Sequence, residues 1–137
     1  MIFLDTNVIS EALRRQPNEA VITWLVRFDA ELALSTVTIA EIAFGIEKIR
    51  TDERAPRLAE GLTNWRRRFA DRIFGLTEEA ALAYGEIMGQ AVRQGRPMSA
   101  PDGMIAAIAL VNRGRLATRN VTDFATTGLD LTSPWDF

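Results

Sequence analysis

Histidine and cysteine are both absent from the 137 residues of this chain. Without cysteine, the chain forms neither disulfides, nor thiolate nucleophiles, nor zinc sites of the cysteine type. Without histidine, it lacks the base of serine–histidine–aspartate hydrolysis and the commonest side-chain metal ligand. If this chain carries out chemistry, its carboxylates must therefore do the work, and it has 18 acidic residues.

Long apolar runs are also missing, since no stretch approaches the ~18 residues that a membrane-spanning helix needs. No basic region precedes the apolar run at the N-terminus, so we expect no signal peptide. The lack of cysteine is compatible with the cytoplasm, where we expect the protein to act. The net charge of −2 indicates little about partners. A length of 137 residues with 47% hydrophobic residues predicts one domain over residues 1–137.

Short apolar runs alternate with amphipathic stretches, which predicts parallel strands joined by right-handed helical crossovers. The expected strands are Met1–Asp5, Glu31–Ser35, Arg72–Leu76 and Arg115–Thr118, with a short edge strand at Leu129–Leu131. The expected helices, from apolar residues at helical spacing, are Thr6–Arg15, Asn18–Phe28, Thr38–Arg50, Glu53–Phe69, Glu78–Gln94 and Ala100–Asn112. The fold class is therefore expected to be α/β, a three-layer α/β/α sandwich with a mostly parallel central sheet of four to five strands.

Four acidic residues lie where the expected structure changes type. Asp5 ends the first strand, and Asp123 follows the fourth strand in a turn. Glu41 and Asp102 are expected in the first turns of apolar helices. Because open parallel sheets place their sites at the carboxyl ends of strands, we expect these acids to meet at one rim.

Each of these acids also has a purely structural explanation. Glu41 and Asp102 lie three residues after a hydroxyl residue, which is the spacing of a capping box. Asp5 could cap the helix that follows it, and Asp123 could hold an Asx turn. Capping alone, however, gives no reason for four acids to converge at one place.

A divalent cation would explain the set. Helix N-termini favour ionised carboxylates, whereas crowding of carboxylates opposes their ionisation, and a cation resolves that conflict. Ligand sets made only of oxygen suit Mg²⁺, with Mn²⁺ as a substitute. With no histidine as base, the ion would lower the pKa of an attacking water, which indicates phosphodiester hydrolysis. Residues that could orient a carboxylate or a water, although turn and cap roles also explain them, are Thr6, Asn7, Thr118 and Asn120.

Four blocks of the sequence, in order, resemble the PIN-domain family. They are Phe-Leu-Asp-Thr-Asn at 3–7, Thr-Ile-Ala-Glu-Ile at 38–42, Asp-Gly-Met-Ile-Ala-Ala at 102–107 and Leu-Ala-Thr-Arg-Asn-Val-Thr-Asp-Phe at 116–124. The closing Pro134-Trp135 also fits, so the resemblance covers essentially the whole chain. The sequence is most similar to the VapC toxins of bacterial toxin–antitoxin pairs, including their FitB-like members.

This resemblance implies a Mg²⁺-dependent endoribonuclease acting on RNA, a homodimer held inactive by a small VapB-type antitoxin. It implies that the catalytic and metal-binding acids are Asp5, Glu41, Asp102 and Asp123. Thr118 and Asn120 match positions that support such a site. Gly103 stands where many relatives carry a larger residue such as alanine, from which we expect a small effect on helix stability and none on chemistry.

Two other functions are compatible with the same acids. A Mg²⁺-dependent phosphomonoesterase usually needs Asp-x-Asp after the first strand, and here Asn7 replaces the second acid. A phosphoryl-accepting domain would need a suitably placed lysine, and the only one is Lys48, inside a predicted helix. A non-catalytic binding or co-repressor module would use the acids merely as helix caps.

Basic residues near the predicted rim could contact RNA phosphates, or they could be surface charges without such a role. These residues are Arg14, Arg15, Arg96 and Arg119. The groove beside the predicted helices Thr38–Arg50 and Glu53–Phe69 is a reasonable place for a partner helix.

Overall fold

Five short strands form one parallel sheet in the computed structural model, which describes residues 1–137. The strands are β1 (Ile2–Leu4), β2 (Leu32–Ser35), β3 (Ile73–Phe74), β4 (Arg115–Ala117) and β5 (Leu131–Thr132). Their order is β3-β2-β1-β4-β5, and all four neighbouring pairs are parallel. The predicted parallel sheet is confirmed, although β5 lies later than the expected edge strand and shares only Leu131 with it.

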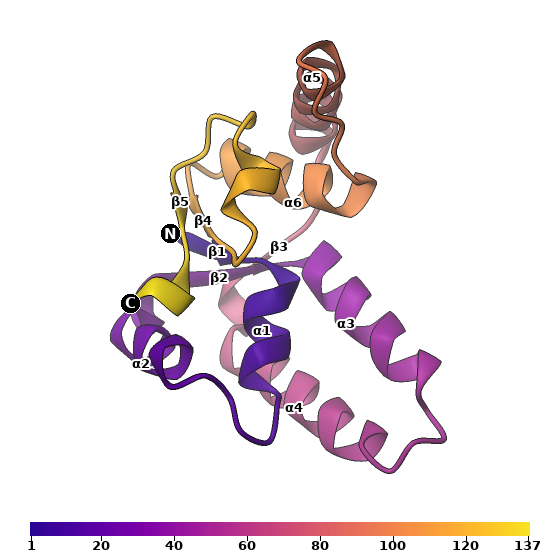
Figure 1. The fold of residues 1–137 in the computed structure, drawn as a ribbon. Helices are drawn as coiled ribbons and strands as arrows, with labels where there is room; N and C mark the ends of the chain where they lie inside the picture. The colour runs from indigo at the N-terminus through magenta and orange to yellow at the C-terminus, as the bar shows by residue number, and fades with distance from the viewer.

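Helices cover both faces of this sheet, which confirms the predicted α/β/α sandwich. They are α1 (Thr6–Ala12), α2 (Glu19–Arg27), α3 (Thr36–Lys48), α4 (Ala55–Arg68), α5 (Glu78–Arg93) and α6 (Ala100–Val111). Figure 1 shows α5 and α6 on one side of the sheet and α1 to α4 on the other. None of these helices combines the length and the apolar character needed to cross a bilayer.

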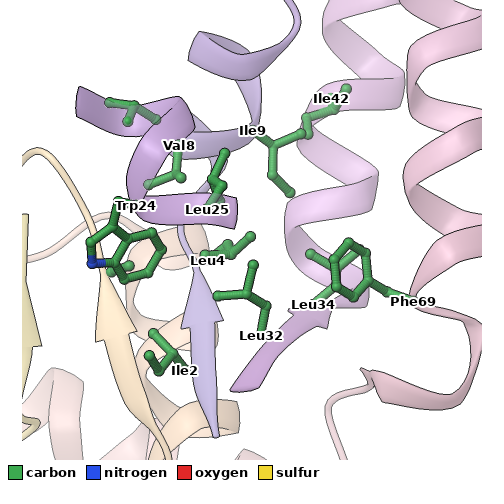
Figure 2. Packing of buried hydrophobic residues seen from close by; sticks show 12 residues of the cluster. Ile2, Leu4, Val8, Ile9, Trp24, Leu25, Leu32, Leu34, Ile42 and Phe69 are labelled. Carbon is green, nitrogen blue, oxygen red and sulfur yellow. The ribbon is translucent and has the colours of Figure 1, made fainter. Parts of the chain in front are cut away.

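The sheet separates two hydrophobic cores, because successive strand residues point to opposite faces. Ile2 and Leu4 of β1 pack into the core that α1 and α2 cover (Figure 2). Phe3, between them, packs into the core formed with α5 and α6. The helix α6 is buried nearly all round, as its uninterrupted apolar sequence predicts. Both cores thus hold β1 rigidly, and the chain leaves this strand directly into Asp5.

A buried acid fixes the connection between α1 and α2. Glu11 is only 5% exposed, and its carboxylate accepts hydrogen bonds from the Asn18 backbone N–H at 2.9 Å and from Arg14 at 3.2 Å. The Asn18 N–H is the main cause that lowers the pKa of Glu11. Asn18 in turn caps α2 by accepting from the N–H groups of Ala20 and Val21, as its sequence position predicts.

Gly103 permits a close approach of α5 to α6. A Cβ at this position would lie only 3.0 Å from a ring carbon of Tyr84 and would overlap the Met88 side chain. The expectation that glycine here affects only helix propensity therefore needs correction, because the residue also has a packing role between two helices.

Gly114 provides a test of how tightly the second core is packed. Its backbone is not left-handed, but an added Cβ would lie 2.7 Å from the Phe3 ring. We expect Gly114→Ala to lower the free energy of unfolding by roughly 1–3 kcal/mol through overpacking. Gly85→Ala in α5, where a Cβ meets nothing within 4 Å, should instead raise it by up to ~1 kcal/mol. Urea unfolding of both variants measures this difference, and effects of the same sign would contradict it.

Candidate active site

Asp5 leaves the carboxyl end of the central strand and is almost fully buried. Its backbone N–H donates to the Ala117 carbonyl at 2.9 Å, which continues the pairing of β1 with β4. Its carboxylate accepts from the Thr6 backbone N–H at 2.8 Å and so caps α1, as predicted. The Thr118 hydroxyl donates to the same carboxylate at 2.8 Å. The residue therefore has a capping role, but its backbone N–H and its carboxylate also bond to the neighbouring strand segment at Ala117 and Thr118.

Thr118 is the centre of a small polar network around Asp5. Besides donating to Asp5, its hydroxyl accepts from the Asn120 backbone N–H at 3.0 Å and from the Asn7 side-chain amide at 3.4 Å. The Asn7 amide also donates to Asp5 at 3.3 Å. Thr118 and Asn7 thus contact the acid directly, whereas Asn120 contributes only its backbone.

Glu41 lies in the second turn of α3, not in the first turn as predicted. The helix begins at Thr36 because Ser35 is its N-cap, with a hydroxyl that accepts from the Thr38 N–H at 3.0 Å. The proposed capping box of Thr38 with Glu41 is therefore wrong. The Glu41 carboxylate instead accepts from the Thr6 hydroxyl at 2.5 Å, which directs it toward the site.

Sequence reasoning missed Ser35 and Thr38 as the residues that position Glu41. The Thr38 hydroxyl donates to the Leu4 carbonyl at 3.2 Å, which ties the start of α3 to the end of β1. Both side chains are buried. The available signal was the serine directly before the first helical residue, a common N-cap arrangement.

Asp102 lies in the first turn of α6, as predicted. The Ser99 hydroxyl caps the helix by accepting from the Asp102 N–H at 3.3 Å, but no Ser99 N–H donates back, so only half of the capping box forms. Asp123 lies in a 3-10 turn, Val121–Phe124. Its carboxylate makes no hydrogen bond, which contradicts an Asx turn.

The four acids influence one another electrostatically. Burial raises the pKa of Asp102 to about 6, and the charges of Asp5, Glu41 and Asp123 add to the rise. Burial is also the main cause that raises the pKa of Asp5, with Glu41 and Asp123 again contributing. No lysine or arginine forms an ion pair with any of the four. The four acids are therefore near enough to influence one another's ionisation, and none of them is neutralised by an ion pair.

This donor set suits a divalent cation. The ionised acids repel one another, and a cation would relieve that repulsion and lower the raised pKa values. No three acidic side chains gather closely enough in this structure to enclose an ion. Such an enclosure is not needed for Mg²⁺, which usually takes one or two carboxylates and keeps several waters. Asp5 and Asp102, with the raised pKa values, are the residues that could hold it.

Crowding of the acids predicts how metal-free stability changes with pH. Folding raises the pKa of Asp102 from 3.8 to about 6, so its contribution to stability falls as the pH rises through that window. In EDTA at pH 7, we expect Asp102→Asn to raise the free energy of unfolding, by on the order of 1 kcal/mol after solvent screening. The gain should vanish near pH 4. Calorimetry across this range measures it, and a less stable variant at pH 7 would show that capping outweighs repulsion.

Comparisons with known proteins identify the family. The sequence profile described as "PIN domain" matches residues 2–128. The plasmid stability protein StbB of Pseudomonas syringae pv. tomato is 38% identical over 138 residues, which cover 99% of both chains. A VapC ribonuclease of Sinorhizobium fredii is 34% identical, again over 99% of both chains. Toxin FitB of Neisseria gonorrhoeae is 38% identical over 98% of this chain and 99% of its own.

Comparison with solved structures indicates the same family. The crystal structure of FitAcB from Neisseria gonorrhoeae superposes with a TM-score of 0.92 at 37% identity and covers 100% of both chains. The profile match includes all four of the acids that the structure brings together. This chain therefore belongs to the PIN-domain family, in which it groups with the VapC ribonucleases and the FitB toxins.

Proposed function

We propose that this protein is an endoribonuclease that hydrolyses RNA phosphodiesters with the help of Mg²⁺, or of Mn²⁺ as a substitute. The observation that carries this proposal is a set of four electrostatically coupled carboxylates, none of which forms an ion pair and two of which have raised pKa values. Raised pKa values at a strand-end cluster are typical of functional sites. The choice of RNA rests on the relative that is named a VapC ribonuclease.

We further propose that the protein acts in the cytoplasm as the toxin of a toxin–antitoxin pair. A relative named toxin FitB, 38% identical over nearly the full length, supports this role. Under this proposal a small VapB-type antitoxin binds the chain and holds it inactive, and the toxin itself is a homodimer.

Residues around the acids would position them for the reaction. The hydrogen bonds from Thr118 and Asn7 fix the Asp5 carboxylate, and the bond from Thr6 fixes Glu41 through one of its two oxygens. A bound divalent ion would lower the pKa of an attacking water. It would also offset the negative charge on the oxygens of the phosphate group. Asp123, whose carboxylate has no protein partner, is free to orient a water or a ligand.

The phosphotransfer alternatives have no support in this structure. Asn7, which replaces the second acid of Asp-x-Asp, uses its amide on Asp5 and its carbonyl oxygen on the Arg119 backbone N–H. Lys48 lies over the Phe44 ring at 5.3 Å, at the far end of α3 from the acids. A module in which the acids are only caps is disfavoured because Glu41 caps nothing.

Cleavage of RNA by purified, partner-free protein tests the proposal. We expect cleavage in Mg²⁺, none in EDTA, and a loss of at least ~100-fold in Asp102→Asn, because an essential acid is neutralised. Asp130→Asn, an exposed acid paired with Arg115 away from the site, is the matched control and should keep wild-type activity. Electrophoresis of end-labelled RNA measures the products. Cleavage by Asp102→Asn at the wild-type rate would contradict the proposed active site.

A further inference from the structure

A polar pocket of about 430 Å³ opens directly beside two of the acids. Asp102 and Asp123 form one part of its wall, and Arg96 is its only basic residue. Hydroxyl residues complete most of the lining: Ser99, Thr122 and Thr126. The volume is in the range of pockets that bind small ligands, which is roughly 300–1,000 Å³. A polymer substrate that reached the acids would therefore have room here for a neighbouring unit.

The backbone of Arg96 is held by the end of α5. The Gly95 N–H donates to the Val92 carbonyl at 3.0 Å, and the Arg96 N–H donates to the Ala91 carbonyl at 2.9 Å. These two bonds make a Schellman motif, and Gly95 takes the left-handed conformation that it requires, with φ 69°. The place of Arg96 in the pocket wall is thus a consequence of how α5 ends and not of a flexible loop.

The side chain of Arg96 is positioned as well, but it is not neutralised. One guanidinium nitrogen donates to the Thr122 carbonyl at 2.8 Å, one residue before Asp123. Arg96 forms no ion pair, although two acids line the same pocket. Since a guanidinium carries five N–H donors, most of them stay available to a ligand.

The other basic candidates near the rim are placed differently. Arg14 pairs with Glu11. Arg119 lies over the Trp135 ring at 5.1 Å. Arg15 is exposed, and none of these three lines the pocket. Of these four basic residues, Arg96 is therefore the one that shares a pocket with Asp102 and Asp123.

A second observation indicates that the pocket is built to receive a polar group. The Thr126 hydroxyl is the one buried side-chain polar atom without a hydrogen-bond partner in the protein. Thr126 is one of the residues that line this pocket, although its hydroxyl oxygen is itself buried. An unpaired buried hydroxyl is unfavourable, so a ligand oxygen that accepts from it after a rotation about χ1 would recover that loss.

We propose that Arg96 binds, in this pocket, a phosphate of the RNA strand adjacent to the phosphodiester that is cleaved. The inference rests on the proposed ribonuclease function and names a substrate-positioning residue for it. A guanidinium fork suits phosphate because it donates two parallel hydrogen bonds. The two acids would repel that phosphate, so the contact forms when a divalent ion offsets their charge.

The test is binding and cleavage of single-stranded RNA by Arg96→Gln, Arg96→Lys and wild type. Arg93→Gln is the matched control, because Arg93 lies one turn earlier, is exposed, forms no ion pair and does not line the pocket. A fluorescein-labelled RNA pool of random sequence serves as the probe. Anisotropy is measured with Ca²⁺ in place of Mg²⁺ to suppress cleavage, between about 50 and 200 mM salt.

We expect Arg96→Gln to weaken binding about tenfold and to raise KM more than it lowers kcat. Loss of one phosphate contact should reduce the slope of log affinity against log salt by about 0.7. Arg96→Lys should keep that slope, and Arg93→Gln should match wild type in both measurements.

Arg96→Gln could bind RNA as tightly as Arg93→Gln and differ only by a lower melting temperature. In that case Arg96 has only a structural role, through its hydrogen bond to the Thr122 carbonyl, and the inference is overturned. If wild type neither binds nor cleaves RNA, the proposed function fails instead, and the inference fails with it. The two failures are therefore distinguishable in one set of experiments.

Discussion

The parallel register between β1 and β4 determines where every part of the acidic site lies. Leu4 pairs with Ala117, so the two residues that follow, Asp5 and Thr118, leave their strands side by side. Their hydrogen bond is buried, and it orients the most enclosed carboxylate of the site. A slip of one residue in this register would turn Thr118 to the opposite face of the sheet and leave Asp5 without that donor.

The same arrangement stores electrostatic repulsion in the folded state. Asp5 and Asp102 are both harder to ionise than free carboxylates because they are buried and near other acids. Two tightly packed cores, which hold β1 on both faces, supply the stability that tolerates this repulsion. Unfavourable local energy at such a place is typical of sites that bind a ligand, since the ligand relieves it.

All six helices and the parallel sheet could be predicted, because apolar spacing and terminating residues are local signals. The convergence of Asp102 and Asp123 followed from the rule about strand ends. The start of α3 was misplaced because Thr38 and Glu41, inside the helix, have the spacing of a capping box, whereas Ser35 is the residue that caps it. The pocket at Arg96 depends on how the turn after α5 meets the segment around Thr122, and no local pattern encodes that contact.

The hydrogen bond between Asp5 and Thr118 joins residues that are 113 positions apart. Since strands β4 and β5 are made last, a chain emerging from the ribosome presents its first acid long before the partners that orient it. The acidic edge is complete only after β4 and the segment that carries Asp123 have been synthesised and β4 has paired with β1. A chain with this topology cannot assemble its acidic edge during synthesis until β4 has joined β1.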